Sequence, residues 1–275
     1  MASNQEIDSS GDIAKISHWE SVWRNTKTVH GFSRYNYYDF RLADLFQSLA
    51  GPGSRVIEIG CGGSRWVSFF DRILRCESWG IDYSPEGLRL TKRQSAGRES
   101  LVRLIQGDFF DESSLPHEYF DMVYSGGFVE HFSETAVVTS RIAQILRPGG
   151  KVVTMIPNFV AIYGLLQRAA NRGVFHKHII MDEILLDSAH SAGGLTPVMP
   201  AHFWGCFCPG VVNYGRLGRV VGLPIKVLQQ AICWTLHALH SDAESRLTSP
   251  FILGVYEKKK QSQSSADPDK RCVES

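Results

Sequence analysis

A glutamate and a cluster of glycines follow a short apolar run in RVIEIGCGGSRW, residues 55–66. Gly60 and Gly62 remove side chains, so a ligand can approach the backbone closely. The helix that we expect after this loop has free N–H groups in its first turn. A dinucleotide would use the pattern G-x-G-x-x-G, but Arg65 stands at its third glycine position. The carboxylate of Glu58 would repel a pyrophosphate and favours a cation, such as the ammonium and sulfonium groups of an adenosyl amino acid.

The elements that position this loop are short apolar strands that alternate with helices. We expect strands at residues 55–60, 76–82, 101–108, 119–127, 151–157 and 249–260. Helices are expected at about residues 65–74, from Ser84 onward, and at about 133–146. Such alternation predicts an α/β fold with a parallel sheet that is covered on both faces. Ligands of these sheets bind beyond the carboxyl ends of the strands.

Five ordered blocks extend the pattern: VIEIGCGG, GIDYS, GDFFD, FDMVYSGGFVEHF and ILRPGGKVVTMIP. Together they resemble the class I S-adenosylmethionine-dependent methyltransferases over about residues 55–157. The resemblance implies a Rossmann-like, doubly wound and mostly parallel seven-stranded sheet with an antiparallel last strand. It also implies S-adenosyl-L-methionine as the cofactor and methyl transfer as the activity.

The resemblance assigns cofactor contacts to residues that match the family motifs. Asp82, at the end of the second strand, would accept from both ribose hydroxyls, because a carboxylate offers two acceptor oxygens. Asp108 would accept from the adenine amino group. The full predicted set is Glu58, Gly60, Cys61, Gly62, Asp82, Tyr83, Asp108, Phe109, Ser125 and Gly126. Ser64 replaces the third glycine of the family's G-x-G-x-G run, and Gly63 is the residue that can take a positive φ in its place.

Methyl transfer needs mainly alignment of the nucleophile, the methyl group and the sulfur, and it needs a base only when the nucleophile must lose a proton. His131 matches the histidine that often follows the fourth strand in the family. Both His131 and His178 are candidate catalytic residues, with a purely structural role as the alternative. The candidate substrate contacts are Trp23, Tyr38, His202 and Phe203, and no metal ligands are expected.

We divide the chain into an N-terminal helical cap (1–50), a methyltransferase domain (51–258) and a disordered tail (259–275). Within the domain, residues 158–248 form a helical or irregular insertion after the fifth strand, which we expect to fold over the cofactor pocket as a substrate lid. They match no pattern that we can name. Their apolar and aromatic content favours an apolar or aromatic small acceptor, methylated at oxygen or nitrogen. A protein side-chain methyltransferase and a cofactor-binding protein without turnover are the alternatives.

Composition excludes some partners. The chain has 275 residues with 29 basic and 28 acidic side chains, a balance that does not favour nucleic acid. The most apolar helical stretch, residues 223–240, is interrupted by polar side chains and is too short to span a membrane. The start of the sequence is polar, without a signal peptide, so we expect a cytoplasmic protein with reduced thiols. The oligomeric state stays open.

Overall fold

Seven strands form one sheet in the part of the chain that the computed structural model describes, residues 11–27, 29–96, 102–215, 218–241 and 243–260. The strands are β1 (Arg55–Ile59), β2 (Glu77–Asp82), β3 (Arg103–Gln106), β4 (Phe120–Gly126), β5 (Leu146–Pro157), β6 (Leu195–Trp204) and β7 (Phe251–Lys258). Their order in the sheet is β3-β2-β1-β4-β5-β7-β6. β1 to β5 are parallel, and β7 runs antiparallel to β5 and β6. The expected mostly parallel sheet with an antiparallel last strand is confirmed.

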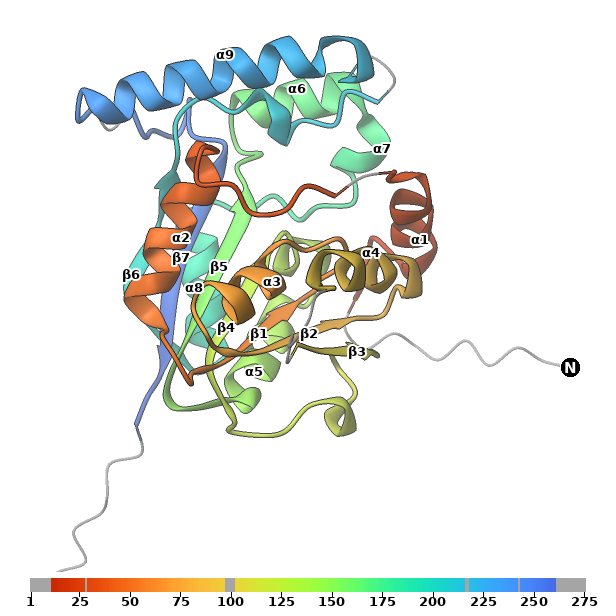
Figure 1. The fold of residues 1–275 in the computed structure, drawn as a ribbon, viewed down its shortest axis with the longest axis vertical. Coiled ribbons are helices and arrows are strands. Elements are labelled where there is room, and N and C mark those ends of the chain that lie inside the picture. The colour runs from red at the N-terminus through yellow and green to blue at the C-terminus, as the bar shows by residue number, and fades with distance from the viewer. Residues whose placement is uncertain (1–10, 28, 97–101, 216–217, 242, 261–275) are drawn as a thin grey trace, which may run out of the picture.

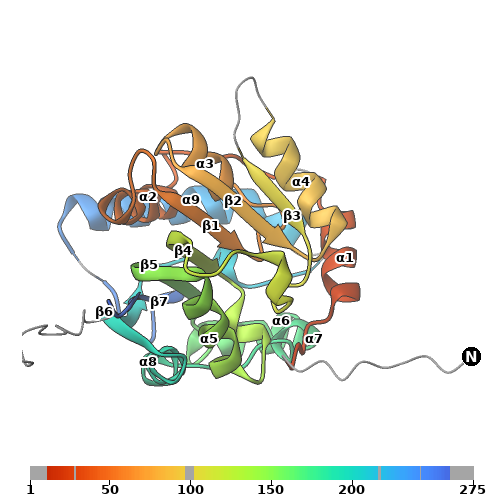
Figure 2. The ribbon, with the colours of Figure 1, turned by 90° about the horizontal axis from the view of Figure 1, so that it is seen from below.

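Helices cover both faces of this sheet (Figure 2). α3 (Trp66–Arg72) and α4 (Pro85–Ser95) contact β1, β2 and β3 on one face, and α5 (Thr135–Ile145) and α8 (Glu183–Ala192) contact β5, β6 and β7 on the other. The central strands carry Ile and Val side chains that are fully buried, as in Ile57 and Val123. Burial from both sides therefore explains the continuous apolar runs of the sequence.

Two helices precede the sheet, within the segment that we expected to be helical (1–50). α1 (Ile16–Asn25) packs against α4, and α2 (Tyr37–Leu49) begins after Asn36, whose side chain accepts from two N–H groups of the first turn. The segment before α1 is held against the rest of the protein, because Asp12 forms a β-bridge with Phe132 and Ala14 is buried. Residues 1–10 and 261–275, which include most of the tail expected at 259–275, lie outside the described residues.

The segment 158–248 contains α6 (Ile162–Ala170), α7 (Arg172–Phe175), α8, β6 and α9 (Gly218–Ala238). Our sequence pattern placed no strand in this segment, whereas the structure places β6 there. Pro197 and Pro200 interrupt the alternation of β6, and proline is tolerated because β6 is the edge strand of the sheet. The pairing of β6 with β7 also shifts register twice, which hides the strand further.

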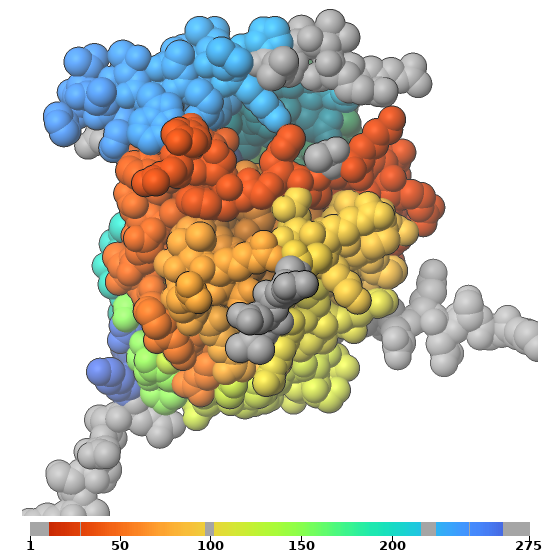
Figure 3. All heavy atoms as spheres, viewed as in Figure 1, coloured from red at the N-terminus to blue at the C-terminus, as the bar shows by residue number. Residues whose placement is uncertain are grey.

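α9 lies across one end of the molecule, beside α6 and over the N-terminal segment (Figures 1 and 3). The N–H of Tyr37 donates to Gln230 Oε1 at 2.8 Å, and Trp234 Nε1 donates to the carbonyl oxygen of Tyr35 at 3.0 Å. α9 is therefore fixed to the start of α2 and to the segment before it. Within the described residues, α9 and the other helices are all too short or too polar to cross a membrane.

Candidate active site

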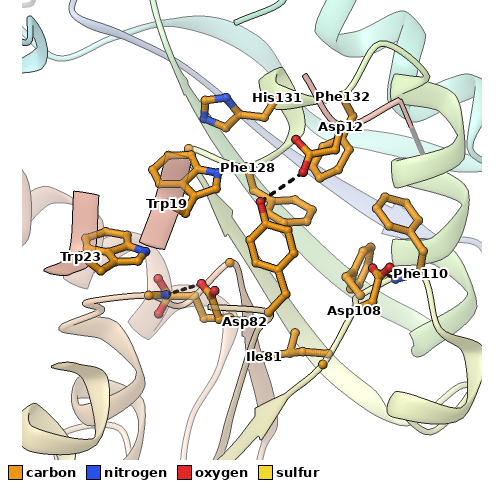
Figure 4. A pocket seen from close by; sticks show the side chains of 18 residues that line it. Asp12, Trp19, Trp23, Ile81, Asp82, Asp108, Phe110, Phe128, His131 and Phe132 are labelled. Atoms are coloured by element: carbon orange, nitrogen blue, oxygen red, sulfur yellow. Dashed lines mark hydrogen bonds between the residues drawn. The ribbon is translucent and has the colours of Figure 1, made fainter. Parts of the chain in front are cut away.

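A cavity of about 370 Å³ lies at the carboxyl ends of the parallel strands β1, β2 and β4. Figure 4 shows Ile81 and Asp82 at one end of it and His131, Phe132 and Asp12 at the other. Its size is within the range of small-molecule sites. The lining residues include eight of the ten predicted cofactor contacts, namely Glu58, Gly60, Gly62, Asp82, Tyr83, Asp108, Phe109 and Gly126.

The glycine loop after β1 needs its glycines for two different reasons. Gly60 has φ +67°, and a Cβ there would lie 2.6 Å from Cδ2 of Phe128. Gly63 has φ +64°, so it takes the left-handed conformation in place of Ser64, as anticipated. The Ser64 hydroxyl instead accepts from the N–H of Trp66 at 2.9 Å and donates to the Glu58 carboxylate. The serine thus caps α3 and fixes the carboxylate below the loop.

Asp82 is held by two backbone donors. Oδ2 accepts from Gly62 N–H and Oδ1 from Ser84 N–H, both at 2.7 Å. Burial raises the pKa of Asp82 to about 6, although these two hydrogen bonds oppose the shift. Each oxygen keeps a second lone pair, so the carboxylate can still accept from a diol in the cavity.

Glu58 is buried at the centre of the site. Burial raises its pKa to about 8, against the lowering effect of the Ser64 hydrogen bond and of the nearby Arg65 guanidinium. A buried carboxyl group of this kind favours its neutral form unless a cation lies beside it. The site is therefore suited to a positively charged ligand group.

The side of the cavity near β3 combines a carboxylate with aromatic rings. Asp108 Oδ1 accepts from Phe110 N–H at 2.9 Å, and the buried Phe109 ring meets Phe128 edge to face at 5.6 Å. The Tyr83 hydroxyl donates to Asp12 Oδ2 at 3.1 Å, so the N-terminal segment is tied to the end of β2. This wall can take a flat apolar ring with polar edges.

Two predicted cofactor residues do not line the cavity. Cys61 is fully buried with Val67 and Leu88 behind the loop, because its side chain points away from the glycine backbone that faces the cavity. Ser125 is also fully buried, and its hydroxyl has no hydrogen-bond partner among the described residues. For both residues, position in the motif predicts a place near the cofactor but not the direction of the side chain.

Three predicted substrate contacts lie elsewhere, and we do not retain them. Tyr38 is buried with Trp204, and its hydroxyl donates to the carbonyl oxygen of Cys206. His202 and Phe203 lie on the edge strand β6, where Phe203 packs against the hydrophobic core and His202 Nδ1 bonds the carbonyl oxygen of Pro200. We predicted these contacts from the aromatic and histidine content of the segments. Composition does not show whether a residue lies near the end of the sheet that carries the cavity.

Trp23, the fourth predicted substrate contact, does line the cavity together with Trp19. The indole of Trp23 lies against the glycine loop, since a Cβ at Gly62 would be 2.7 Å from its Nε1. Trp19 stacks on Trp23 at 5.9 Å and meets His131 edge to face at 5.0 Å. α1 therefore contributes an aromatic wall that runs from the loop to His131.

The two candidate catalytic histidines are neighbours, with ring centroids 4.5 Å apart. His131 lines the cavity, whereas His178 is not among its lining residues. Burial lowers the pKa of His131 to about 3 and also lowers that of His178, so both rings are neutral near pH 7. Glu130 beside them is buried, which raises its pKa to about 8.

Our sequence reasoning missed several lining residues, chiefly Asp12, Phe128 and Phe132. Both phenylalanines belong to the block that contains His131, and the apolar spacing around that histidine could have indicated them. Asp12 stands in a polar stretch without a local signal. Its bridge to Phe132 and the hydrogen bond from the Tyr83 hydroxyl bring it to the cavity.

Comparison with known proteins agrees with this geometry. Residues 57–154 match the model of a methyltransferase domain family. The chain is 26% identical over 186 residues to a phosphatidylethanolamine N-methyltransferase of Cereibacter sphaeroides. The aligned region covers 62% of this chain and 90% of that protein. Together with the sequence motifs, these similarities support a class I S-adenosylmethionine-dependent methyltransferase.

The chain is also similar to a second curated methyltransferase and to a solved structure. It is 32% identical over 101 residues to a fatty-acid O-methyltransferase of Mycolicibacterium smegmatis, but this match covers only 36% of the chain and 35% of the relative. The solved structure of a methyltransferase from Archaeoglobus fulgidus has a TM-score of 0.55 at 17% identity and covers 87% of this chain and 98% of that one. The second similarity concerns the fold alone.

Proposed function

We propose that this methyltransferase transfers a methyl group from S-adenosylmethionine to an oxygen or nitrogen atom of a small acceptor with an apolar or aromatic body. The observation that carries the proposal is the division of the cavity. Asp82 lies at one end, and the rings of Trp19 and Phe132 surround His131 at the other (Figure 4). One end thus fits a nucleoside, and the other fits an apolar acceptor.

The residues present fit the cofactor. Asp82 offers acceptor oxygens for the ribose hydroxyls, and Asp108 with the Phe109 ring suits the adenine. Glu58 lies buried below the glycine loop, where a Cβ at Gly62 would lie 2.7 Å from Trp23 Nε1 and 2.9 Å from Asp82 Oδ2, so only glycine fits between these side chains. When bound, the cofactor supplies an electrophilic methyl group on a sulfonium, so that the hard chemistry is its own.

The protein's own contribution is orientation and exclusion of water. The aromatic wall of α1 and the phenylalanines after β4 enclose the acceptor end, which would hold the nucleophile in line with the methyl group. Such positioning can lower a barrier by roughly 7–11 kcal/mol. The comparisons support an apolar acceptor, since the two relatives above are named for a phospholipid and a fatty acid and act at nitrogen and oxygen.

The test is transfer of a labelled methyl group from S-adenosylmethionine to a panel of fatty acids, phosphatidylethanolamine, phenols and peptides. We expect label in an organic-extractable small molecule and none in peptides. Labelled peptide alone would replace the small acceptor by a protein side chain. Tight binding of S-adenosylhomocysteine without transfer to any acceptor would instead support a binding protein without turnover.

A further inference from the structure

Three side chains that can ligate a metal ion converge beside the acceptor end of the cavity. Glu130 and His131 belong to the 3₁₀ turn η2 (Val129–His131), and His178 follows α7. One donor atom of each residue lies within 4.8 Å of those of the other two. The backbone holds the two segments together, because the N–H of Ile179 donates to the carbonyl oxygen of Glu130 at 2.7 Å.

Both imidazoles are oriented by backbone carbonyl groups. His131 Nδ1 lies 2.6 Å from the carbonyl oxygen of Lys177, and His178 Nδ1 lies 2.8 Å from that of Val174. A carbonyl oxygen can only accept, so each Nδ1 carries the hydrogen and each Nε2 keeps its lone pair. Metal-ligating histidines are held in the same manner in proteins, with the other ring nitrogen donating to a carbonyl or carboxylate.

The carboxylate of Glu130 is incompletely partnered. The residue is only 2% exposed, and its Oε2 is among the buried polar atoms without a hydrogen-bond partner in the described residues. Its Oε1 lies 3.9 Å from His131 Nε2, too far for a hydrogen bond. An isolated buried carboxylate is costly, and coordination to a cation is one of the ways in which proteins compensate it.

We propose that Glu130, His131 and His178 bind one divalent zinc-like ion at the acceptor end of the cavity. Two imidazoles and one carboxylate are a donor set of catalytic zinc sites, which leave a fourth position open for water or substrate. The open position would face the cavity, because His131 lines it. The Lys177 ammonium is the nearby charge that opposes a cation, and its Nζ is turned to the carbonyl oxygen of Ala14 at 3.3 Å.

The role of this ion rests on the proposed function, whereas the site itself does not. For a hydroxyl acceptor, an ion at the open position would bind the oxygen and lower its pKa, so that the proton is released to water near neutral pH and the anionic oxygen keeps lone pairs to attack the methyl group. The metal ion would then promote loss of the acceptor's proton, a role that a histidine base would otherwise have. The ion would also orient the acceptor atom beside the aromatic wall of α1.

The test is titration of the chelator-treated protein with Zn²⁺, by calorimetry and by competition with a fluorescent chelator. We expect the wild-type protein to bind one equivalent of zinc. His178→Ala and Glu130→Gln should each weaken the zinc affinity at least about tenfold, because losing even a residue that only supports a metal ligand costs about 10–100-fold in affinity. His202→Ala is the matched control, because this histidine lies on the edge strand away from the cavity. Its zinc affinity should equal that of the wild type.

The wild-type protein provides a readout that needs no variant. Co²⁺ added to the metal-free protein should give the visible absorption of a low-coordinate nitrogen and oxygen site. Absence of stoichiometric zinc binding, or equal loss in the control variant, would overturn the site. Bound zinc with full methyl transfer by the metal-free protein would overturn only the role of the ion, and the proposed function would stand.

Discussion

At the scale of single residues, Asp82 is the side chain on which nucleoside binding should depend most directly. We expect Asp82→Asn to weaken binding of S-adenosylhomocysteine about tenfold, because hydrogen bonds to a charged group contribute roughly 1.5–3 kcal/mol. The amide can still accept from Gly62, which keeps the loop in place. Calorimetric titration measures the change, with the exposed Asp44→Asn on α2 as control. Equal affinities in Asp82→Asn and wild type would exclude the ribose contact.

Glu58 should make stability depend on pH. Its pKa is about 8 in the folded protein and near 4.5 when unfolded, so the folded state holds a proton that the unfolded state releases between these values. Folding stability contributed by this group therefore falls as pH rises through that window. Glu58→Gln should increase the free energy of unfolding by a few kcal/mol at pH 8.5, and by much less at pH 5. The melting temperature should rise accordingly.

Thermal unfolding of the cofactor-free protein at both pH values measures this difference. Glu134→Gln, at an exposed position before α5, is the control and should show no growing difference with pH. A gain for Glu58→Gln that is the same at pH 5 and pH 8.5 would contradict the assignment of a buried neutral carboxyl group.

At the scale of elements, the loop between β1 and α3 is defined by the backbone of Gly60. Gly60→Ala should destabilise the protein by more than the roughly 1–2 kcal/mol that a left-handed conformation costs, because the new methyl group would also meet the Phe128 ring. Cofactor binding should weaken with it. Gly51→Ala is the matched control, since a Cβ added there would have nothing within 4 Å and its φ is not positive. Denaturant unfolding should show Gly51→Ala unchanged or slightly stabilised, and equal effects at both positions would contradict the close approach.

At the scale of the whole molecule, cofactor binding should couple to global unfolding, because the cavity joins residues from the N-terminal segment to the strand ends of the sheet. S-adenosylhomocysteine at a hundredfold excess over its Kd should stabilise the protein by about 2.7 kcal/mol. For a domain of this size, that corresponds to a rise of about 5–10 °C in Tm. NAD should leave Tm unchanged. A rise with NAD alone would contradict the assignment of the glycine loop.

The sequence by itself determined the five parallel strands, the antiparallel β7 and the glycine loop that lines the cavity. Glu58, Gly60 and Asp82 are encoded locally, at the ends of apolar strands, and parallel strands bring their carboxyl ends to one edge of a sheet. Chain order alone therefore indicated that these residues meet. The sequence also explained why Ser64 can replace the third glycine of the family motif. The adjacent Gly63 can adopt the left-handed conformation that serine avoids.

Tertiary structure alone decided the acceptor end. Asp12 reaches the cavity through a bridge to a distant segment, and His178 reaches Glu130 through pairing of the backbone at Ile179. Such contacts depend on packing between segments far apart in the chain, which leaves no periodic or spacing signal in either one. β6 was hidden for a related reason, since Pro197 and Pro200 interrupt its pattern and an edge strand tolerates residues without an N–H group.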